Sequence, residues 1–216
     1  MNKQATTDAT FSATEPEIRT ALAQFLIGDF GGPKPLLASE VRYGSEQRRA
    51  DLVLVSEYSH AFEIKSDYDT TVRLSGQLNE YSQTFDFTLV VTTGTHIDRV
   101  RTIAPRKVGL LLYKDGAVTL LRRPQQNKRL SKPHLAASIS KTTLLEVLPN
   151  IRRVTSAEEV REIAATTLNT SALRRLFFRE MHLRFAKSSA LFFAETDFQL
   201  NIEDLSLLRR EARLYS

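Results

Sequence analysis

The feature that most constrains this chain is a pair of short apolar segments joined by the four residues SEYS. Residues 51–55 (DLVLV) and 60–65 (HAFEIK) are rich in side chains that favour strands. Two such runs with so short a connection predict an antiparallel β-hairpin, and the first run predicts a buried strand. We therefore expect a sheet at the centre of the fold.

The pattern of apolar residues predicts further elements in the order helix, strand, hairpin, helix, strand, short helix and hairpin. Outside the first hairpin, their expected ranges are 15–27, 36–43, 70–85, 87–92, 97–103 and 108–122. Thr14 and Glu17 have the spacing of a capping box at the start of the first helix, and Asp115-Gly116 is a strong turn signal in the last hairpin. Strands and helices in this order predict an α/β fold, a mixed sheet with helices on its faces.

The character of the sequence changes after residue 122. Residues 122–132 (RRPQQNKRLSK) contain five basic residues and no acid, which favours an exposed linker. From residue 141 onward the pattern is helical, and Ser156 with Glu159 forms a second capping box. These changes predict a flexible N-terminus, an α/β domain, a basic linker and an all-helical C-terminal region, over residues 1–14, 15–124, 125–140 and 141–216.

The first hairpin also carries charged side chains in a suggestive arrangement. Alternate residues of a strand share a face, so Glu63 and Lys65 point to the same side. A turn centred within residues 57–58 sets Asp51 opposite Ile64, and a shift of one residue brings the Asp51 carboxylate onto that side. Two adjacent carboxylates repel each other and need a cation, and Mg²⁺ is held by carboxylates together with water and phosphate. The hairpin therefore predicts a metal site suited to cleaving phosphodiesters, with the Ile64 main-chain carbonyl as a further ligand.

These residues resemble the signature of the PD-(D/E)XK nuclease superfamily, whose fold is restriction-endonuclease-like. The match consists of an acid, an acid-x-Lys triplet and the Q-x-x-x-Y motif of RecB-type nucleases, here Asp51, Glu63-Ile64-Lys65, Gln77 and Tyr81. The resemblance is greatest to an uncharacterised bacterial family of PD-(D/E)XK-like proteins, with shared segments at 49–52, 63–70, 73–77 and 81–86. It covers about the first 125 residues, and departs from the superfamily pattern at Ala50, where Pro is usual.

The resemblance implies a metal-dependent deoxyribonuclease that hydrolyses phosphodiester bonds. Asp51 and Glu63 would hold Mg²⁺ or Mn²⁺, and Lys65 would act as catalytic base or stabilise charge on the phosphate. Gln77 and Tyr81 would support the site. The superfamily serves DNA repair, restriction and defence against mobile elements, which leaves the biological role open.

Several of these residues also have simpler explanations. Glu40 is a candidate extra metal ligand, while Glu17 is more simply explained by its capping role. Arg49 and Arg73 are candidate contacts to DNA, and a solvated surface position explains Arg73 equally well. Asp69 is expected to cap the helix that follows the hairpin.

Composition narrows the class of protein further. The chain has 216 residues and no cysteine, which excludes disulfide scaffolds, cysteine-ligated metals and thiol nucleophiles. No apolar run approaches the ~18 residues that span a bilayer, so we expect a cytoplasmic protein without membrane contact. The net charge of +5 permits DNA binding without requiring it. A homodimer would suit cleavage of both DNA strands. The alternative is a catalytically silent module of the same fold that binds DNA, or a protein partner through its C-terminal helices.

Overall fold

The structure is a computed structural model that describes residues 12–28, 34–44, 48–148, 156–195 and 200–209, so most of the flexible N-terminus expected at 1–14 lies outside these ranges. Six strands form one mixed sheet in chain order, with β1–β3 antiparallel, β3–β5 parallel and β6 antiparallel to β5. The strands are β1 (Leu36–Tyr43), β2 (Arg48–Val55), β3 (Ser59–Lys65), β4 (Phe87–Thr92), β5 (Gly109–Lys114) and β6 (Ala117–Arg122). The α/β fold with a mixed sheet is thereby confirmed.

The β2–β3 hairpin has a register one residue away from the expected one. Leu52 pairs with Phe62 and Val55 with Ser59, because the turn centres on Glu57. The expectation that Asp51 faces Ile64 is therefore wrong. The printed strand pairing ends at Leu52 and Phe62, and beyond it the Asp51 carboxylate accepts a hydrogen bond from the Ile64 amide at 2.7 Å, which holds Asp51 next to Glu63.

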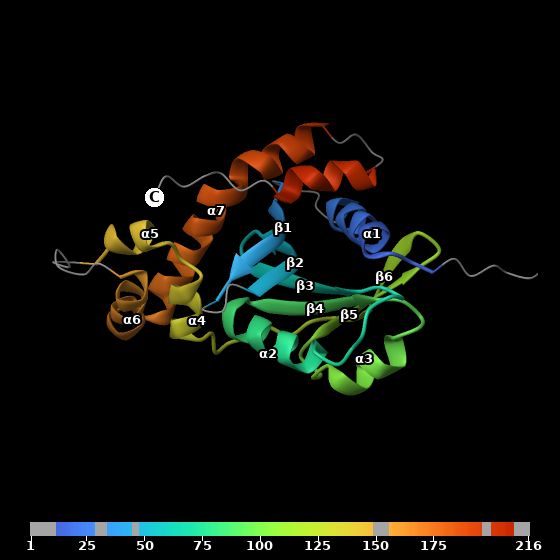
Figure 1. Cartoon of the computed structure of the whole chain (residues 1–216), viewed down its shortest axis with the longest axis horizontal. Helices are drawn as coiled ribbons and strands as arrows, with labels where there is room; N and C mark the ends of the chain where they lie inside the picture. The colour runs from blue at the N-terminus through green and yellow to red at the C-terminus, as the bar shows by residue number, and fades with distance from the viewer. Residues whose placement is uncertain (1–11, 29–33, 45–47, 149–155, 196–199, 210–216) are drawn as a thin grey trace, which may run out of the picture.

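Helices cover both faces of the sheet (Figure 1). On one face, α1 (Glu15–Gly28) packs Ile18 and Leu22 against Leu52 and Phe62. On the other face, α2 (Leu74–Thr84) and α3 (Ile97–Ile103) bury a smaller apolar cluster over β4 and β5. The Thr14–Glu17 capping box is present, since Glu17 accepts hydrogen bonds from the Thr14 amide and hydroxyl at 2.7 Å.

The start of α2 corrects a prediction. Asp69 does not cap this helix: its carboxylate accepts hydrogen bonds from the amide and hydroxyl of Ser66 at 2.8 and 2.6 Å. The helix begins at Leu74, and Arg73 at the N-cap position makes no side-chain capping bond. Asp69 thus closes a tight turn after β3, and this turn delays the helix by about one turn.

After β6 the described residues form helices and their connections, as expected from residue 141 onward. They are α4 (Lys132–Ala137), α5 (Lys141–Leu145), α6 (Ala157–Thr167), α7 (Thr170–Glu195) and the 3₁₀ helix η1 (Ile202–Arg209). Ser156 accepts a hydrogen bond from the Glu159 amide at 3.1 Å, which confirms the second helix start. None of the helices in the described ranges is long and apolar enough to cross a membrane.

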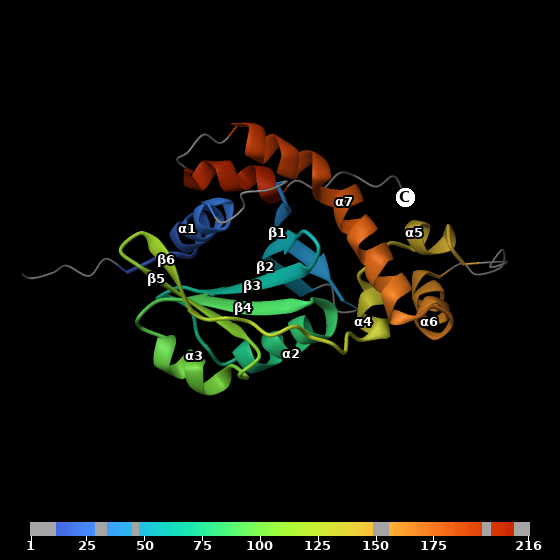
Figure 2. The ribbon, with the colours of Figure 1, turned by 180° about the vertical axis from the view of Figure 1, so that it is seen from behind.

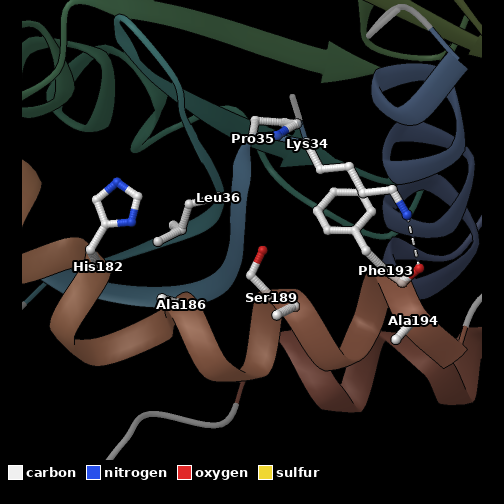
Figure 3. Close-up of a pocket in the computed structure, with 9 residues that line it drawn as sticks. Lys34, Pro35, Leu36, His182, Ala186, Ser189, Phe193 and Ala194 are labelled. Atoms are coloured by element: carbon white, nitrogen blue, oxygen red, sulfur yellow. Dashed lines mark hydrogen bonds between the residues drawn. The ribbon is translucent and has the colours of Figure 1, made fainter. Parts of the chain in front are cut away.

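Helix α7 passes along the edge strand β1 and contributes to the apolar cores on both faces of the sheet (Figure 2). Phe177 and Phe185 belong to the core beneath α4 and α6, whereas Phe192 belongs to the core beneath α1. The Leu37 amide of β1 donates to Ser189 Oγ at 3.0 Å. A pocket of about 360 Å³ remains between Leu36 and α7, and Figure 3 shows Lys34 donating to the Phe193 carbonyl at its rim.

The segment expected to be an exposed basic linker is partly packed. Asn127 is buried, its amide donates to the Asp86 carbonyl at 2.7 Å, and its side chain donates to the Phe85 carbonyl at 2.8 Å. Helix α4 then begins at Lys132, inside the range expected to be a linker. The prediction of a solvated linker is therefore wrong for these residues, because main-chain carbonyls of the α2–β4 connection hold them against the core.

Candidate metal and catalytic site

Three carboxylates meet where α1 begins beside β1 and β2. Glu15 lies in the first turn of α1, Glu40 in β1 and Asp51 in β2, and one oxygen of each lies within 4.8 Å of the others. The β1–β2 register brings two of them together, since Ser39 pairs with Leu52 and Val41 with Ala50. All three side chains are partly exposed, so the cluster is open to solvent.

Glu40 occupies an unusual backbone conformation within β1. Its φ is +56°, in the left-handed region, while the residues on either side keep their strand pairing. A residue other than glycine in this region costs on the order of 1 kcal/mol or more, and such strain concentrates at functional sites. The distortion leaves the Glu40 carboxylate within 2.7 Å of Arg19 in α1.

Arg19 supplies the buried positive charge of the cluster. Its side chain is 2% exposed and forms ion pairs with Glu15 and with Glu40. Arg49 also lies 3.7 Å from Glu40, but it is 57% exposed and its charge is largely solvated. Three carboxylates therefore face one desolvated cation.

Asp51 carries the clearest sign of this imbalance. Burial raises the pKa of its carboxyl well above the usual value, the neighbouring Glu63 raises it further, and Glu15 adds to the effect. The Ile64 amide opposes this shift by donating to Asp51 Oδ2 at 2.7 Å. The metal-free cluster thus favours a proton on Asp51, which a bound cation would displace.

Glu63 lies next to Asp51 with both carboxylate oxygens occupied. Oε1 accepts a hydrogen bond from Lys65 Nζ at 2.8 Å, and Oε2 accepts one from the Tyr81 hydroxyl at 2.7 Å. All three side chains are buried. Burial and the charge of Glu63 raise the pKa of Tyr81 well above its usual value, so its hydroxyl remains a proton donor.

The other residues predicted for the site lie around this group. Gln77 precedes Tyr81 by one turn of α2, and its buried Oε1 makes no hydrogen bond within the described residues. Arg49 is exposed next to Glu40, and Arg73 is exposed at the start of α2. Ile64 contributes its amide to Asp51, while a role for its carbonyl as a metal ligand stays a prediction.

Comparison with known proteins gives the chain a family. The model of the family described as Bacteriophage P4 protein cII matches residues 9–209, almost the whole chain. The chain belongs to this cII family. Protein cII of Enterobacteria phage P4 is 24% identical over 209 residues, which cover 92% of this chain and 79% of that protein. A protein of unknown function from Silicibacter pomeroyi has a similar structure at a TM-score of 0.42 and 14% identity, over 76% of this chain and 90% of that one. Neither description states an activity.

One member of the acidic cluster in this cII-family protein was not found by sequence reasoning. Glu15, rather than Glu17, joins the cluster, because Glu17 is used by the capping box. In a capping box the acid three residues after the N-cap residue bonds back to it, and here that acid is Glu17. Glu15 has no such role, so its carboxylate can join the acidic cluster. The structure brings Asp51 and Glu40 together with Glu15, and places Glu63, Lys65 and Tyr81 in a second group beside them.

Proposed function

We propose that the protein is a metal-dependent deoxyribonuclease with the PD-(D/E)XK arrangement of a restriction-endonuclease-like fold. The observation that carries the proposal is that two groups lie next to each other, the acidic cluster of Glu15, Glu40 and Asp51 and the buried Glu63–Lys65–Tyr81 group. They are joined where Asp51 accepts a hydrogen bond from the amide of Ile64, the residue between Glu63 and Lys65. Asp51 and Glu63 come from the neighbouring strands β2 and β3, as the sequence resemblance implies. We propose that the enzyme works in the cytoplasm and cleaves DNA in repair, restriction or defence against mobile elements.

The charges of the site fit a divalent cation. Ionised Glu15, Glu40 and Asp51 carry three negative charges, and the buried Arg19 supplies one positive charge. Glu63 and Lys65 balance each other. The remaining charge of about two, together with an all-oxygen donor set that is open to solvent, suits Mg²⁺ or Mn²⁺. Asp51, Glu40 and Glu15 would hold the ion, with Glu63 beside them.

Each residue has a role that follows from its surroundings. When bound, the ion would polarise a phosphoryl oxygen and lower the pKa of a coordinated water. Lys65, buried next to Glu63, would hold a proton or a positive charge close to the phosphate. Tyr81 fixes the Glu63 carboxylate through its hydroxyl, and the buried, unpaired Oε1 of Gln77 would accept a hydrogen bond from a water molecule enclosed beside it.

A cleavage panel tests the proposal. Full-length protein is incubated with plasmid, linear, single-stranded, flap and junction DNA in Mg²⁺, in Mn²⁺ and in EDTA. We expect cleavage of at least one substrate with metal only, and a loss of at least 100-fold in rate for Lys65→Met and Asp51→Asn. Glu162→Gln is the control for loss of one negative charge, because its side chain is exposed on α6, in the C-terminal helical region. Cleavage in EDTA, or undiminished cleavage by both site variants, would contradict the assignment.

A silent module that binds DNA or a protein partner is the second candidate. It is favoured by the fact that Arg19 and Lys65 already pair with three of the four acids. In that case the wild type binds no Mn²⁺ at millimolar concentrations. Metal binding that is lost in Asp51→Asn supports the nuclease instead.

A further inference from the structure

A cleft lined by four arginines lies at the C-terminal end of β6, outside the site described above. It has a volume of about 780 Å³, and its lining includes Arg101, Arg106, Arg122 and Arg123, with no acidic residue. The remaining lining residues come from the end of α3 and the two residues after it, from β5 and β6, and from the segment after β6. A cleft of this composition is a candidate site for an anion.

The positive charge in this cleft is poorly neutralised by the protein. Arg101 has one distant partner, Asp98 at 3.7 Å, and both side chains are mostly exposed. Within the described residues, Arg106, Arg122 and Arg123 have no carboxylate partner. Arg122 is held in place by main-chain carbonyls, since Nε donates to Val108 at 2.8 Å and Nη2 to Pro105 at 3.1 Å. Its Nη1 is left for a ligand.

The arginines also repel one another. Burial lowers the pKa of Arg122, and the nearby charges of Arg106 and Arg101 lower it further. An anion bound between these side chains would remove that repulsion. The cleft is larger than one phosphate requires, so it suits consecutive phosphates rather than a single ion.

The cleft lies on the same face of the sheet as Glu63. Across the strands, Glu63 pairs with Val90, Val90 with Leu110, and Leu110 with Arg122. Strands are spaced ~4.8 Å apart, so this row separates the Glu63 and Arg122 backbones by about 14 Å. Val90 and Leu110, between these two points, are buried beneath α2 and α3, so DNA that reached both places would have to pass outside these helices. One DNA strand has a phosphate every ~3.4 Å along the helix axis, so such a path spans more than about four nucleotides.

We propose that the arginine cleft binds the phosphate backbone of DNA at a second place, separated from the acidic site by α2 and α3. The choice of DNA as the ligand rests on the proposed function, whereas binding in the cleft does not require cleavage. Guanidinium groups match phosphate through paired N–H donors, which favours arginine for such contacts. The cleft would therefore hold the DNA in place while the acidic site acts on a bond further along.

The test measures affinity of the full-length protein for fluorescent duplex and single-stranded DNA in EDTA, by anisotropy over a range of salt. The double variant Arg106→Gln/Arg123→Gln leaves Arg122 and its carbonyl bonds intact. The control Arg175→Gln/Lys187→Gln removes the same charge from exposed positions on α7. For duplex DNA, two lost phosphate contacts should reduce the slope of log affinity against log salt by about 1.8 and weaken binding at least tenfold near 0.1 M salt.

The outcomes separate this inference from the proposed function. Weaker binding and a smaller slope in the cleft variant but not in the control support the cleft, even if the wild type cleaves nothing. Equal losses of DNA affinity in the two variants would show a general effect of surface charge and would overturn the proposal that the cleft binds DNA. A cleft variant that binds like the wild type also overturns it, and leaves the nuclease proposal standing if cleavage is observed.

Discussion

Replacing Asp51 with asparagine should stabilise the metal-free protein while disrupting the proposed metal site. Unit charges 4.8 Å apart interact by about 3.5 kcal/mol at an effective dielectric constant of 20, and Asp51 faces two such carboxylates with Arg19 as a partial offset. Protonation of Asp51 limits this electrostatic destabilisation of the folded state, because the neutral carboxyl group is not repelled by its neighbours. For a group with an ordinary pKa near 3.9, the penalty at pH 7 cannot exceed about 4 kcal/mol. Asparagine keeps an oxygen to accept the Ile64 N–H.

We therefore expect Asp51→Asn to raise the free energy of unfolding by about 1–3 kcal/mol at pH 7 in EDTA, or the melting temperature by roughly 2–12 °C. The sign of the pH dependence follows from the raised pKa. Protonation stabilises the folded wild type below that pKa, so the advantage of the variant shrinks as the pH falls toward 5. Urea unfolding at both pH values measures this.

The same variant separates stability from metal binding. Mn²⁺ at 100 times its Kd should stabilise the wild type by about 2.7 kcal/mol and leave Asp51→Asn unchanged. The control Glu162→Gln should alter stability by no more than about 0.5 kcal/mol, because its side chain is exposed. A loss of 1 kcal/mol or more in Asp51→Asn in EDTA would refute the reasoning, because the carboxylate would then be a stabilising acceptor rather than a strained charge.

Three further predictions follow from individual contacts. Tyr81→Phe removes the donor to the buried Glu63 Oε2 and should cost about 1–3 kcal/mol in urea unfolding, whereas Tyr68→Phe, at a residue that is 72% exposed, should cost nothing measurable. Asp86→Ala leaves the Arg174 guanidinium without its carboxylate and should cost about 3–5 kcal/mol, with faster trypsin cleavage in α7; an unchanged urea midpoint would contradict this. Binding of Mn²⁺ should release a proton from Asp51, so its calorimetric enthalpy should depend on the ionisation enthalpy of the buffer and its affinity should weaken as the pH falls; identical enthalpies in two buffers would exclude that release.

The strands and most helices were predictable because their signals are local. Alternation and apolar runs predicted β1, β3 and β4. Asp115-Gly116 predicted the last hairpin, and both residues have the positive φ angles that its turn requires. The capping residues predicted the starts of two helices. The delayed start of α2 was missed because Asp69 has two local uses, and only the tertiary structure decides between capping a helix and closing the Ser66 turn.

The site was predictable only in part. Asp51, Glu63 and Lys65 lie on one hairpin, so strand geometry brings them together, although the register was one residue off because turn centres are weakly encoded. Glu15 and Arg19 belong to a helix that reaches the hairpin through packing, and no spacing in the sequence reports that contact. The left-handed conformation of Glu40 likewise leaves no signal in the sequence, since glutamate does not favour it.

The path of α7 along β1 determines which shorter fragments of the protein can fold. Residues 15–124, taken alone, would expose the surfaces that Phe177, Phe185 and Phe192 cover on opposite sides of the sheet. They would also expose the edge of β1 from which Leu37 donates to Ser189, and bare strand edges recruit other chains. An expression fragment ending near residue 124 should therefore precipitate, and any exchange of this module between proteins would have to carry α7 with it.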